Sequence, residues 1–227
     1  MTSTASTSTA IPNTTAQVDT IDTILGAERA GVLADIRAAR PDSRRNAQRS
    51  FDALFSPVDD AEVSLSERLT IAAFAVGLHD EALLWPFYSR RLAEQAEHPA
   101  QSTALAAELA EGAGHGPFGT YREAGLVAES TDGGRYRVTP ENREVFGPRL
   151  VAALEHTHLL VFRPREASPA ALDTLIDAGW SVTGIVTLSQ LVAYLSFQLR
   201  VVHGLAELAA DIVNTDTGTD TDKDTDR

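Results

Sequence analysis

Cysteine is absent from this chain of 227 residues, and its one methionine is Met1. The absence of cysteine excludes disulfides, thiolate metal ligands, iron–sulfur clusters and a thiol nucleophile. Aromatic residues are also scarce, at 6% of the sequence. Because sheet sandwiches are rich in aromatic and β-branched residues, this composition favours packed helices, and we expect an all-α fold.

Basic residues are few as well: 19 Lys and Arg stand against 32 Asp and Glu, for a net charge of −13. Nucleic-acid binding needs a basic face, so we expect no nucleic-acid partner. No run of 18 apolar residues occurs, and the first 30 residues lack the basic and apolar regions of a signal peptide. We therefore expect a cytoplasmic protein with no membrane partner.

The two ends of the chain differ in composition from the middle. Residues 1–18 carry no charged side chain and are rich in Ser and Thr, and residues 214–227 alternate Thr with Asp. Neither segment can bury enough apolar surface to offset the entropy lost on ordering. We expect two disordered tails around one helical domain over residues 19–213.

Local signals predict where several helices begin and end. Ser64 and Glu67 form a capping box, and the helix that it opens is apolar on all sides, as in a buried helix. Ser168-Pro169 begins another helix, which Gly179 ends as a C′ glycine. Further helices are expected at 28–39, 42–55, from Asp80 or nearer Trp85 to about Glu97, 102–111, from Thr139-Pro140 to about Val161 with a kink at Pro148, and from Val182 to about Leu208.

The segment from 112 to 139 is broken up by glycines. Asp132-Gly133-Gly134, followed by residues 135–138, indicates either a small hairpin near 131–138 or an ordered loop.

The final helix carries two adjacent apolar stripes. One stripe is a seam whose apolar residues recur every three or four positions. In the other stripe two polar side chains, Tyr194 and Gln198, occur one helical turn apart. A buried Tyr and Gln need hydrogen-bond partners, so they form either a structural network or part of a cavity wall. Because two stripes need more cover than one neighbouring helix provides, we expect a homo-oligomer, a dimer or a closed ring. The seam consists of Ile185, Leu188, Val192, Leu195, Leu199, Val202 and Ala206.

Residues 155–208 contain Pro164, then Gly179-Trp180-Ser181, then Ala193-Tyr194 through Arg200 in one long helix. This order resembles the C-terminal part of the carboxymuconolactone decarboxylase (CMD) and alkylhydroperoxidase D-like superfamily. Two asparagines of the family's long helix are replaced here by Ser196 and Leu199. The resemblance implies an AhpD-like helical bundle.

Upstream, Ser66 through His79 resembles the helix that precedes the family's Cys-x-x-Cys-x-x-x-His motif. If the motif's histidine corresponds to Tyr88, its cysteines fall on Glu81 and Leu84. The family reduces peroxide with one thiolate and resolves the sulfenic acid with the second thiol. Because this chain has no cysteine, it cannot carry out the first step of that cycle, the attack of a thiolate on the peroxide.

The polar residues that remain at the corresponding region are the candidates for a site. Two of them also have a structural explanation. Glu67 completes a capping box, and His79 lies near a helix C-terminus, where an imidazole is stabilising. We expect no metal and no cofactor. The catalytic candidates are Glu67, His79 and Tyr88, and the ligand-binding candidates are Arg90, Tyr194 and Gln198.

Three functions follow from this set. The first is an accessory or ligand-binding protein of peroxide metabolism, with a cysteine-bearing alkylhydroperoxidase-like partner and no thiol peroxidase activity of its own. The second is a cofactor-free decarboxylase or isomerase in which Glu67, His79 and Arg90 perform acid–base chemistry. The third is a purely structural oligomer. A closed pocket lined by Glu67 and His79 would favour the second, and a filled core the third.

The absence of cysteine generates a direct prediction. The purified protein should not consume an organic hydroperoxide with a dithiol reductant above a heat-denatured control, because no residue can form a sulfenic acid. Peroxide loss followed by a colorimetric assay measures this. Turnover above the control would refute the prediction.

Overall fold

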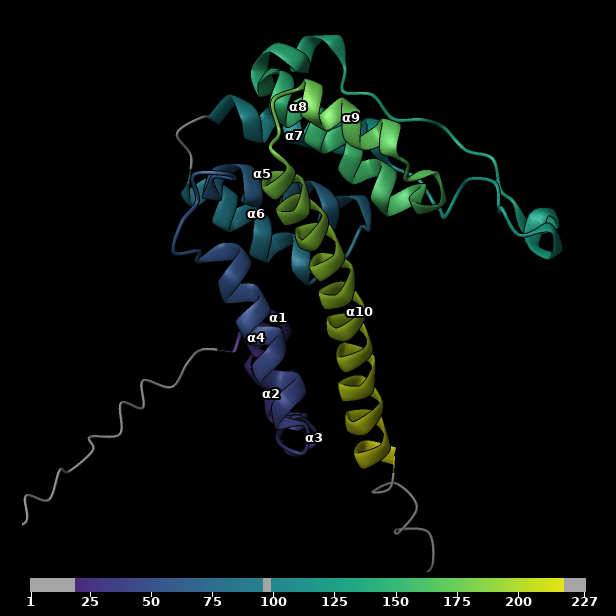
Figure 1. The fold of residues 1–227 in the computed structure, drawn as a ribbon. Coiled ribbons are helices and arrows are strands. Elements are labelled where there is room, and N and C mark those ends of the chain that lie inside the picture. Colours follow the sequence, from purple (N-terminus) through teal and green to yellow (C-terminus); the bar gives the residue numbers. More distant parts are fainter. Residues whose placement is uncertain (1–18, 96–98, 219–227) are drawn as a thin grey trace, which may run out of the picture.

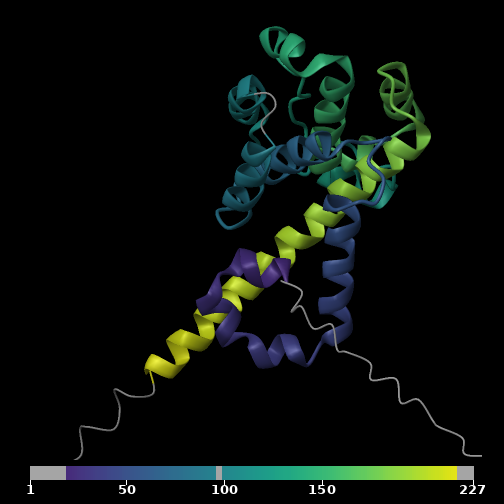
Figure 2. The ribbon, with the colours of Figure 1, turned by 90° about the vertical axis from the view of Figure 1, so that its left-hand side faces the viewer.

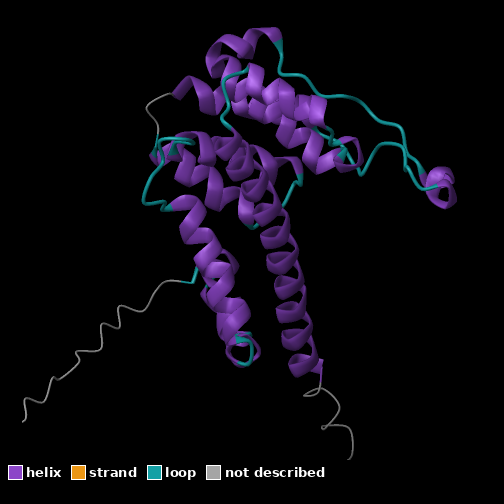
Figure 3. Ribbon diagram, viewed as in Figure 1, coloured by secondary structure: helices purple, strands orange, loops and turns teal. Residues whose placement is uncertain are grey.

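The computed structural model describes residues 19–95 and 99–218, and these residues are mainly helical (Figures 1 and 3). They contain no β-strand, only one isolated bridge between Gly119 and Thr131, so the expected all-α fold is confirmed. Of the two alternatives for residues 131–138, the structure has the ordered loop and not the hairpin. The predicted tail at 1–18 lies outside the described residues, as do residues 219–227. The first five residues of the other predicted tail, 214–218, are helical and not disordered as expected. The elements are α1 (Thr20–Leu25), α2 (Ala27–Val32), α3 (Ala34–Ala38), α4 (Pro41–Phe55), α5 (Leu65–Leu78), α6 (Leu84–Glu94), α7 (Pro99–Gly112), η1 (Ala124–Glu129), α8 (Pro140–Phe162), η2 (Pro164–Glu166), α9 (Pro169–Asp177) and α10 (Val182–Gly218).

The N-terminal region consists of three short helices where one helix over 28–39 was expected. Asp19 caps α1 by accepting a hydrogen bond from the Asp22 amide at 3.0 Å. The same carboxylate binds Arg37 and Arg44, each at 2.7 Å. These ion pairs join α1 to α3 and α4, so contacts across the sequence stabilise helices that are individually too short to be stable.

Helix α5 is the centre of the molecule. The predicted capping box is confirmed, because the Ser64 hydroxyl accepts from the Glu67 amide and the Glu67 carboxylate accepts from the Ser64 amide. Every residue from Arg68 to Val76 is buried. Helices α4, α6, α7, α8 and α10 of the same chain surround α5.

Helix α6 begins at Leu84, close to the later of the two expected starts. Asp80 does not cap it, because Leu83 holds the N-cap position, and Asp80 itself is in the left-handed region with φ of 50°. This conformation turns the chain between α5 and α6, which pack against each other.

Helices α8 and α9 have the predicted boundaries. The kink in α8 lies at Gly147, where φ is 71°, directly before Pro148. The Ser168 hydroxyl caps α9 by accepting from the Ala171 amide. Gly179 follows with φ of 91°, which confirms its role as the C′ residue.

Helix α10 continues past its expected end at Leu208 to Gly218. Its N-terminal part packs in the body formed by α5–α9, and the rest extends beyond that body beside α1–α4 (Figures 1 and 2). Its segment Val182–Thr215 has a window of mean hydropathy 1.4, so it is long and apolar enough to cross a membrane by length and composition alone. Half of that window is buried in the structure.

The seam of α10 is covered within the chain. Helices α1, α2, α5 and α8 are among those that pack against α10. The apolar periodicity of the seam therefore needs no second subunit, and the homo-oligomer stays a prediction. The exposed apolar residues of the helix are Val182, Val186, Phe197, Leu208 and Val213, whereas Ile185, Leu188, Val192, Leu195, Leu199 and Val202 are buried.

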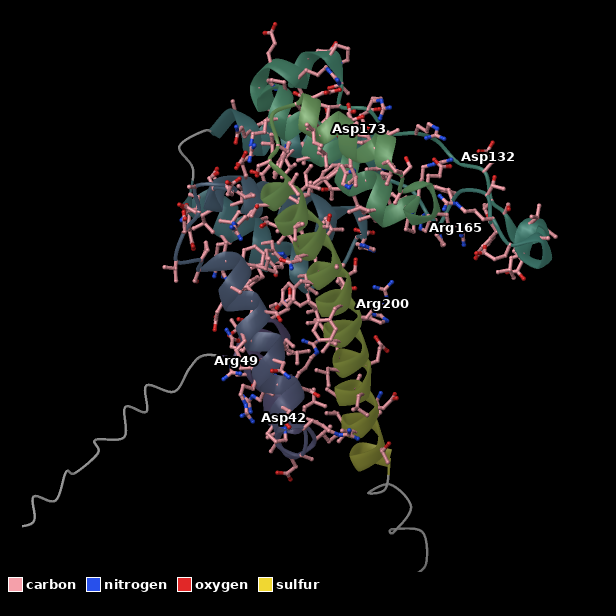
Figure 4. All side chains as sticks on the ribbon, viewed as in Figure 1. Asp42, Arg49, Asp132, Arg165, Asp173 and Arg200 are labelled. Carbon is pink, nitrogen blue, oxygen red and sulfur yellow. The ribbon has the colours of Figure 1, made fainter. Side chains whose placement is uncertain are left out.

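A long arm connects α7 to α8 and carries η1 at its tip (Figures 1 and 4). The buried Glu108 carboxylate anchors its return to the body. It accepts hydrogen bonds from the Tyr136 hydroxyl at 2.6 Å, the Thr139 amide at 3.1 Å and the Asn142 amide group at 2.7 Å. Burial by itself would raise the pKa of Glu108, but these hydrogen bonds outweigh it and hold the pKa below its usual value.

Burial of the seam predicts different effects for two substitutions on α10. Leu195→Asp should lower the free energy of unfolding by about 4 kcal/mol or more, because it places an unpaired charge in the core. Phe197→Asp is the control, because Phe197 is 47% exposed whereas Leu195 is 1% exposed. Urea unfolding followed by circular dichroism measures both, and equal stabilities would contradict this packing.

The Glu108 anchor predicts a dependence on pH. Glu108→Gln should lower the free energy of unfolding at pH 7 by about 2 kcal/mol, because an amide cannot accept all of these hydrogen bonds. The pKa of Glu108 is lower in the folded state than in the unfolded state, where it is about 4.3. The carboxylate therefore stabilises the fold at pH values above about 4.3, and this stabilisation is lost as the pH falls through the folded-state pKa.

The difference between wild type and Glu108→Gln should therefore be largest near neutral pH and shrink in acid. Glu111→Gln is the control, since Glu111 is exposed on the same helix. A variant at Glu108 as stable as wild type at pH 7 would show that the network does not anchor the arm.

Candidate functional site

Glu67, the first catalytic candidate, is fully engaged in structural contacts. Besides its part in the capping box, its Oε1 accepts a hydrogen bond from Arg149 Nε at 2.7 Å. The Arg149 guanidinium also lies over the Trp180 ring, 4.1 Å from its centre. These contacts join the start of α5 to α8 and to the turn before α10.

His79 lies at the opposite end of α5 from Glu67. Twelve residues of helix separate them, which is about 18 Å along the axis. His79 is exposed, and partial desolvation of its ring and the charge of Arg200 lower its pKa, so the imidazole is neutral at pH 7. Arg90 is exposed on α6. The structure therefore does not gather Glu67, His79 and Arg90 into one site.

Three other candidates do meet. The Tyr88 hydroxyl donates to Gln198 Oε1 at 2.5 Å, and Gln198 Nε2 donates to the Tyr194 hydroxyl at 3.2 Å. Tyr88 and Gln198 are completely buried, and Tyr194 is 8% exposed. Burial raises the pKa of both phenols, so both stay protonated at neutral pH. Both residues form a structural network, and Tyr194, but not Gln198, also lines a groove.

This groove lies between α4 and α10 and has a volume of about 810 Å³. The two helices meet near the body and diverge away from it (Figure 2). The lining residues of each helix follow helical spacing, so one face of each helix forms a wall. These residues are Ser43, Asn46, Ala47, Ser50, Ala53 and Leu54 of α4, and Thr187, Gln190, Ala193, Tyr194 and Phe197 of α10.

Burial divides the lining into a floor and a rim. The floor consists of the buried residues Ala47, Leu54, Tyr194 and Arg68. The rim is exposed and contains both polar and apolar residues, of which Phe197 is the largest. An apolar floor with few polar groups and a volume of roughly 300–1,000 Å³ is typical of small-molecule sites. The exposed rim residues are Ser43, Asn46, Ser50, Ala53, Asp59, Gln190, Ala193 and Phe197.

This groove and its one buried charge, Arg68, were not predicted from the sequence. The signal was present in both cases. Small and polar residues recur along α4 at spacings of three and four where a core-facing helix would carry large apolar ones. Arg68 directly precedes the apolar run of a helix that is buried on all sides, so a charge there required an explanation.

A second hollow, of about 920 Å³, lies at the C-terminal end of α5. Its polar lining includes His79, Asp80, His115 and Arg200. Arg200 projects from α10 on the side away from Arg49 and Asp42 of α4, so this hollow and the groove open on different sides of the helix (Figure 4). His79 is the only sequence candidate in it.

The positions that the sequence resemblance would match with the family's two cysteines hold Glu81 and Leu84. Leu84 is completely buried. The Glu81 carboxylate lies 3.8 Å from His203 Nδ1. Within residues 19–95 and 99–218, no three His, Asp or Glu side chains are grouped to hold a metal ion.

Comparison with known proteins identifies no relative: no protein-family model matches the chain, and a search of curated proteins finds no match. The resemblance of residues 155–208 to the CMD and alkylhydroperoxidase D-like superfamily therefore stays a prediction.

Proposed function

We propose that this chain is a cysteine-free, CMD-like ligand-binding protein whose site is the groove between α4 and α10. One observation carries the proposal: a groove of about 810 Å³ with a buried floor lies between α4 and α10. The resemblance in residues 155–208 supports the superfamily, and the absence of cysteine supports a role without thiol chemistry.

The position of the polar side chains favours ligand binding over the decarboxylase or isomerase alternative. General acid–base catalysis needs its groups within hydrogen-bond reach of one substrate. Glu67 and His79 lie at opposite ends of α5, and Arg149 occupies the Glu67 carboxylate.

The groove itself favours ligand binding over a purely structural role. Its floor includes Tyr194, whose hydroxyl is held by the buried Gln198. A wall fixed in this way keeps its shape without a ligand, which lowers the cost of binding.

Under this proposal the protein is an accessory in peroxide metabolism. It binds a small molecule beside a cysteine-bearing alkylhydroperoxidase-like partner, which performs the thiol chemistry. The superfamily resemblance is the support for this partner, and affinity capture that recovers such a protein tests it.

Binding of a neutral apolar probe tests the groove. Wild-type protein should bind decanamide in isothermal titration calorimetry. Ser50→Trp should weaken binding at least about tenfold, equal to about 1.4 kcal/mol, because the new ring occupies the groove between its walls. Ser50 is exposed, so the substitution leaves the core intact.

Arg49→Trp is the matched control. Arg49 is the adjacent exposed residue of α4, does not line the groove, and projects on the side away from α10 (Figure 4). It should bind decanamide as wild type does. Absence of binding to wild type, or equal weakening by both tryptophans, would reject the groove as the site.

A further inference from the structure

Arg68 differs from the other buried arginines among residues 19–95 and 99–218. Arg37 is paired with the Asp19 carboxylate at 2.7 Å, and Arg163 is paired with Glu166. Arg68 is only 5% exposed, yet none of the ion pairs in the described part of the chain includes it.

Backbone carbonyls satisfy part of the Arg68 guanidinium. Its Nε donates to the Val63 carbonyl at 2.9 Å, and its Nη1 donates to the Leu54 carbonyl at 3.1 Å. Neither carbonyl carries a formal charge. Desolvation lowers the pKa of Arg68, while the more distant charges of Asp60 and Glu67 act in the opposite direction.

The remaining nitrogen of the guanidinium, Nη2, has no hydrogen-bond partner within the described part of the chain. It also keeps some contact with solvent, because it is not one of the fully buried polar atoms that lack a partner. Arg68 lines the groove. A guanidinium in this position offers charge-assisted hydrogen bonds to an anion in the groove, and such bonds are about twice as strong as neutral ones.

The rest of the floor has a different chemistry. Away from Arg68 it is formed by Ala47, Leu54 and the ring of Tyr194. Leu54 lies beside Arg68, and Ser43 lies at the far end of the α4 wall, about 16 Å away along the helix axis. The groove therefore has a cationic end and an elongated, largely apolar floor.

Asp59 is the one acidic side chain in the lining. It is exposed, and its Oδ1 accepts a hydrogen bond from the Ala61 amide at 2.9 Å. The net charge of −13 opposes an anion at long range, but salt screens that effect beyond about 8 Å, whereas contact with the buried Arg68 is screened much less.

We propose that the groove binds an aliphatic monocarboxylate, with the carboxylate on the Arg68 guanidinium and the alkyl chain along the floor between α4 and α10. This assignment rests on the proposed function, because it names the class of ligand for the same site.

Three ligands of equal chain length test the headgroup: decanoate, neutral decanamide and cationic decylamine, titrated calorimetrically at pH 7.5. Wild type should bind decanoate about tenfold more tightly than decanamide, and decylamine most weakly. Arg68→Met should bind decanoate and decanamide equally. Arg49→Met removes the same charge outside the groove and should keep the wild-type preference.

The outcomes separate the two proposals. Equal binding of decanoate and decanamide to wild type overturns the carboxylate assignment and leaves the groove as an apolar site. Tighter binding of decylamine overturns it in favour of Asp59. If no ligand binds, the proposed function fails as well. Should Arg68→Met not fold, Arg68→Lys keeps the charge and should keep a preference for decanoate, and the wild-type comparison needs no variant.

Discussion

Burial of α5 on every side is the constraint on which the rest of the structure depends. Its residues from Leu69 to Val76 are all buried, so no face is left for solvent. Helices α4, α6, α7, α8 and α10 must therefore enclose it, although they come from both halves of the chain. This enclosure places Tyr88 of α6 against Gln198 of α10, which are 110 residues apart in sequence.

The groove is a consequence of how α10 serves two parts of the molecule. Near its start α10 helps to cover α5, and farther along it packs against α1 and α2. Helix α4 leaves the body beside α10 but diverges from it, and its facing residues are too small to close the space. The ion pairs of Asp19 with Arg37 and Arg44 keep α4 at that distance by joining it to α1 and α3.

The elements that could be predicted from the sequence are those that depend on local chemistry. The Ser64 and Glu67 capping box, the cap at Ser168 and the C′ glycine at 179 involve residues close in sequence, so spacing alone reveals them. Helix α1 was missed because its stability comes from Arg37 and Arg44, which lie far from it along the chain.

Periodicity likewise showed that the α10 seam is buried but not which helices bury it. Leu195 and Leu199 are buried within the chain itself, so their periodicity alone does not indicate a subunit interface. The site was harder still. Tyr88, Tyr194 and Gln198 could be identified by residue type. The position of Arg68 before an apolar run indicates a buried charge, but whether a carboxylate pairs with it depends on residues distant in sequence, which spacing does not reveal.

The same contacts that stabilise the core also make the groove rigid. Arg68 joins the end of α4 to the start of α5 through the Leu54 and Val63 carbonyls, so its guanidinium is held in one orientation. On the opposite wall, Tyr88 orients the Gln198 amide, and that amide holds Tyr194. Neither wall has to reorganise when a ligand enters, and binding energy is then not spent on ordering side chains. Under the proposed function, such a preorganised groove binds its ligand without thiol chemistry, through hydrogen bonds, one buried charge and apolar contact.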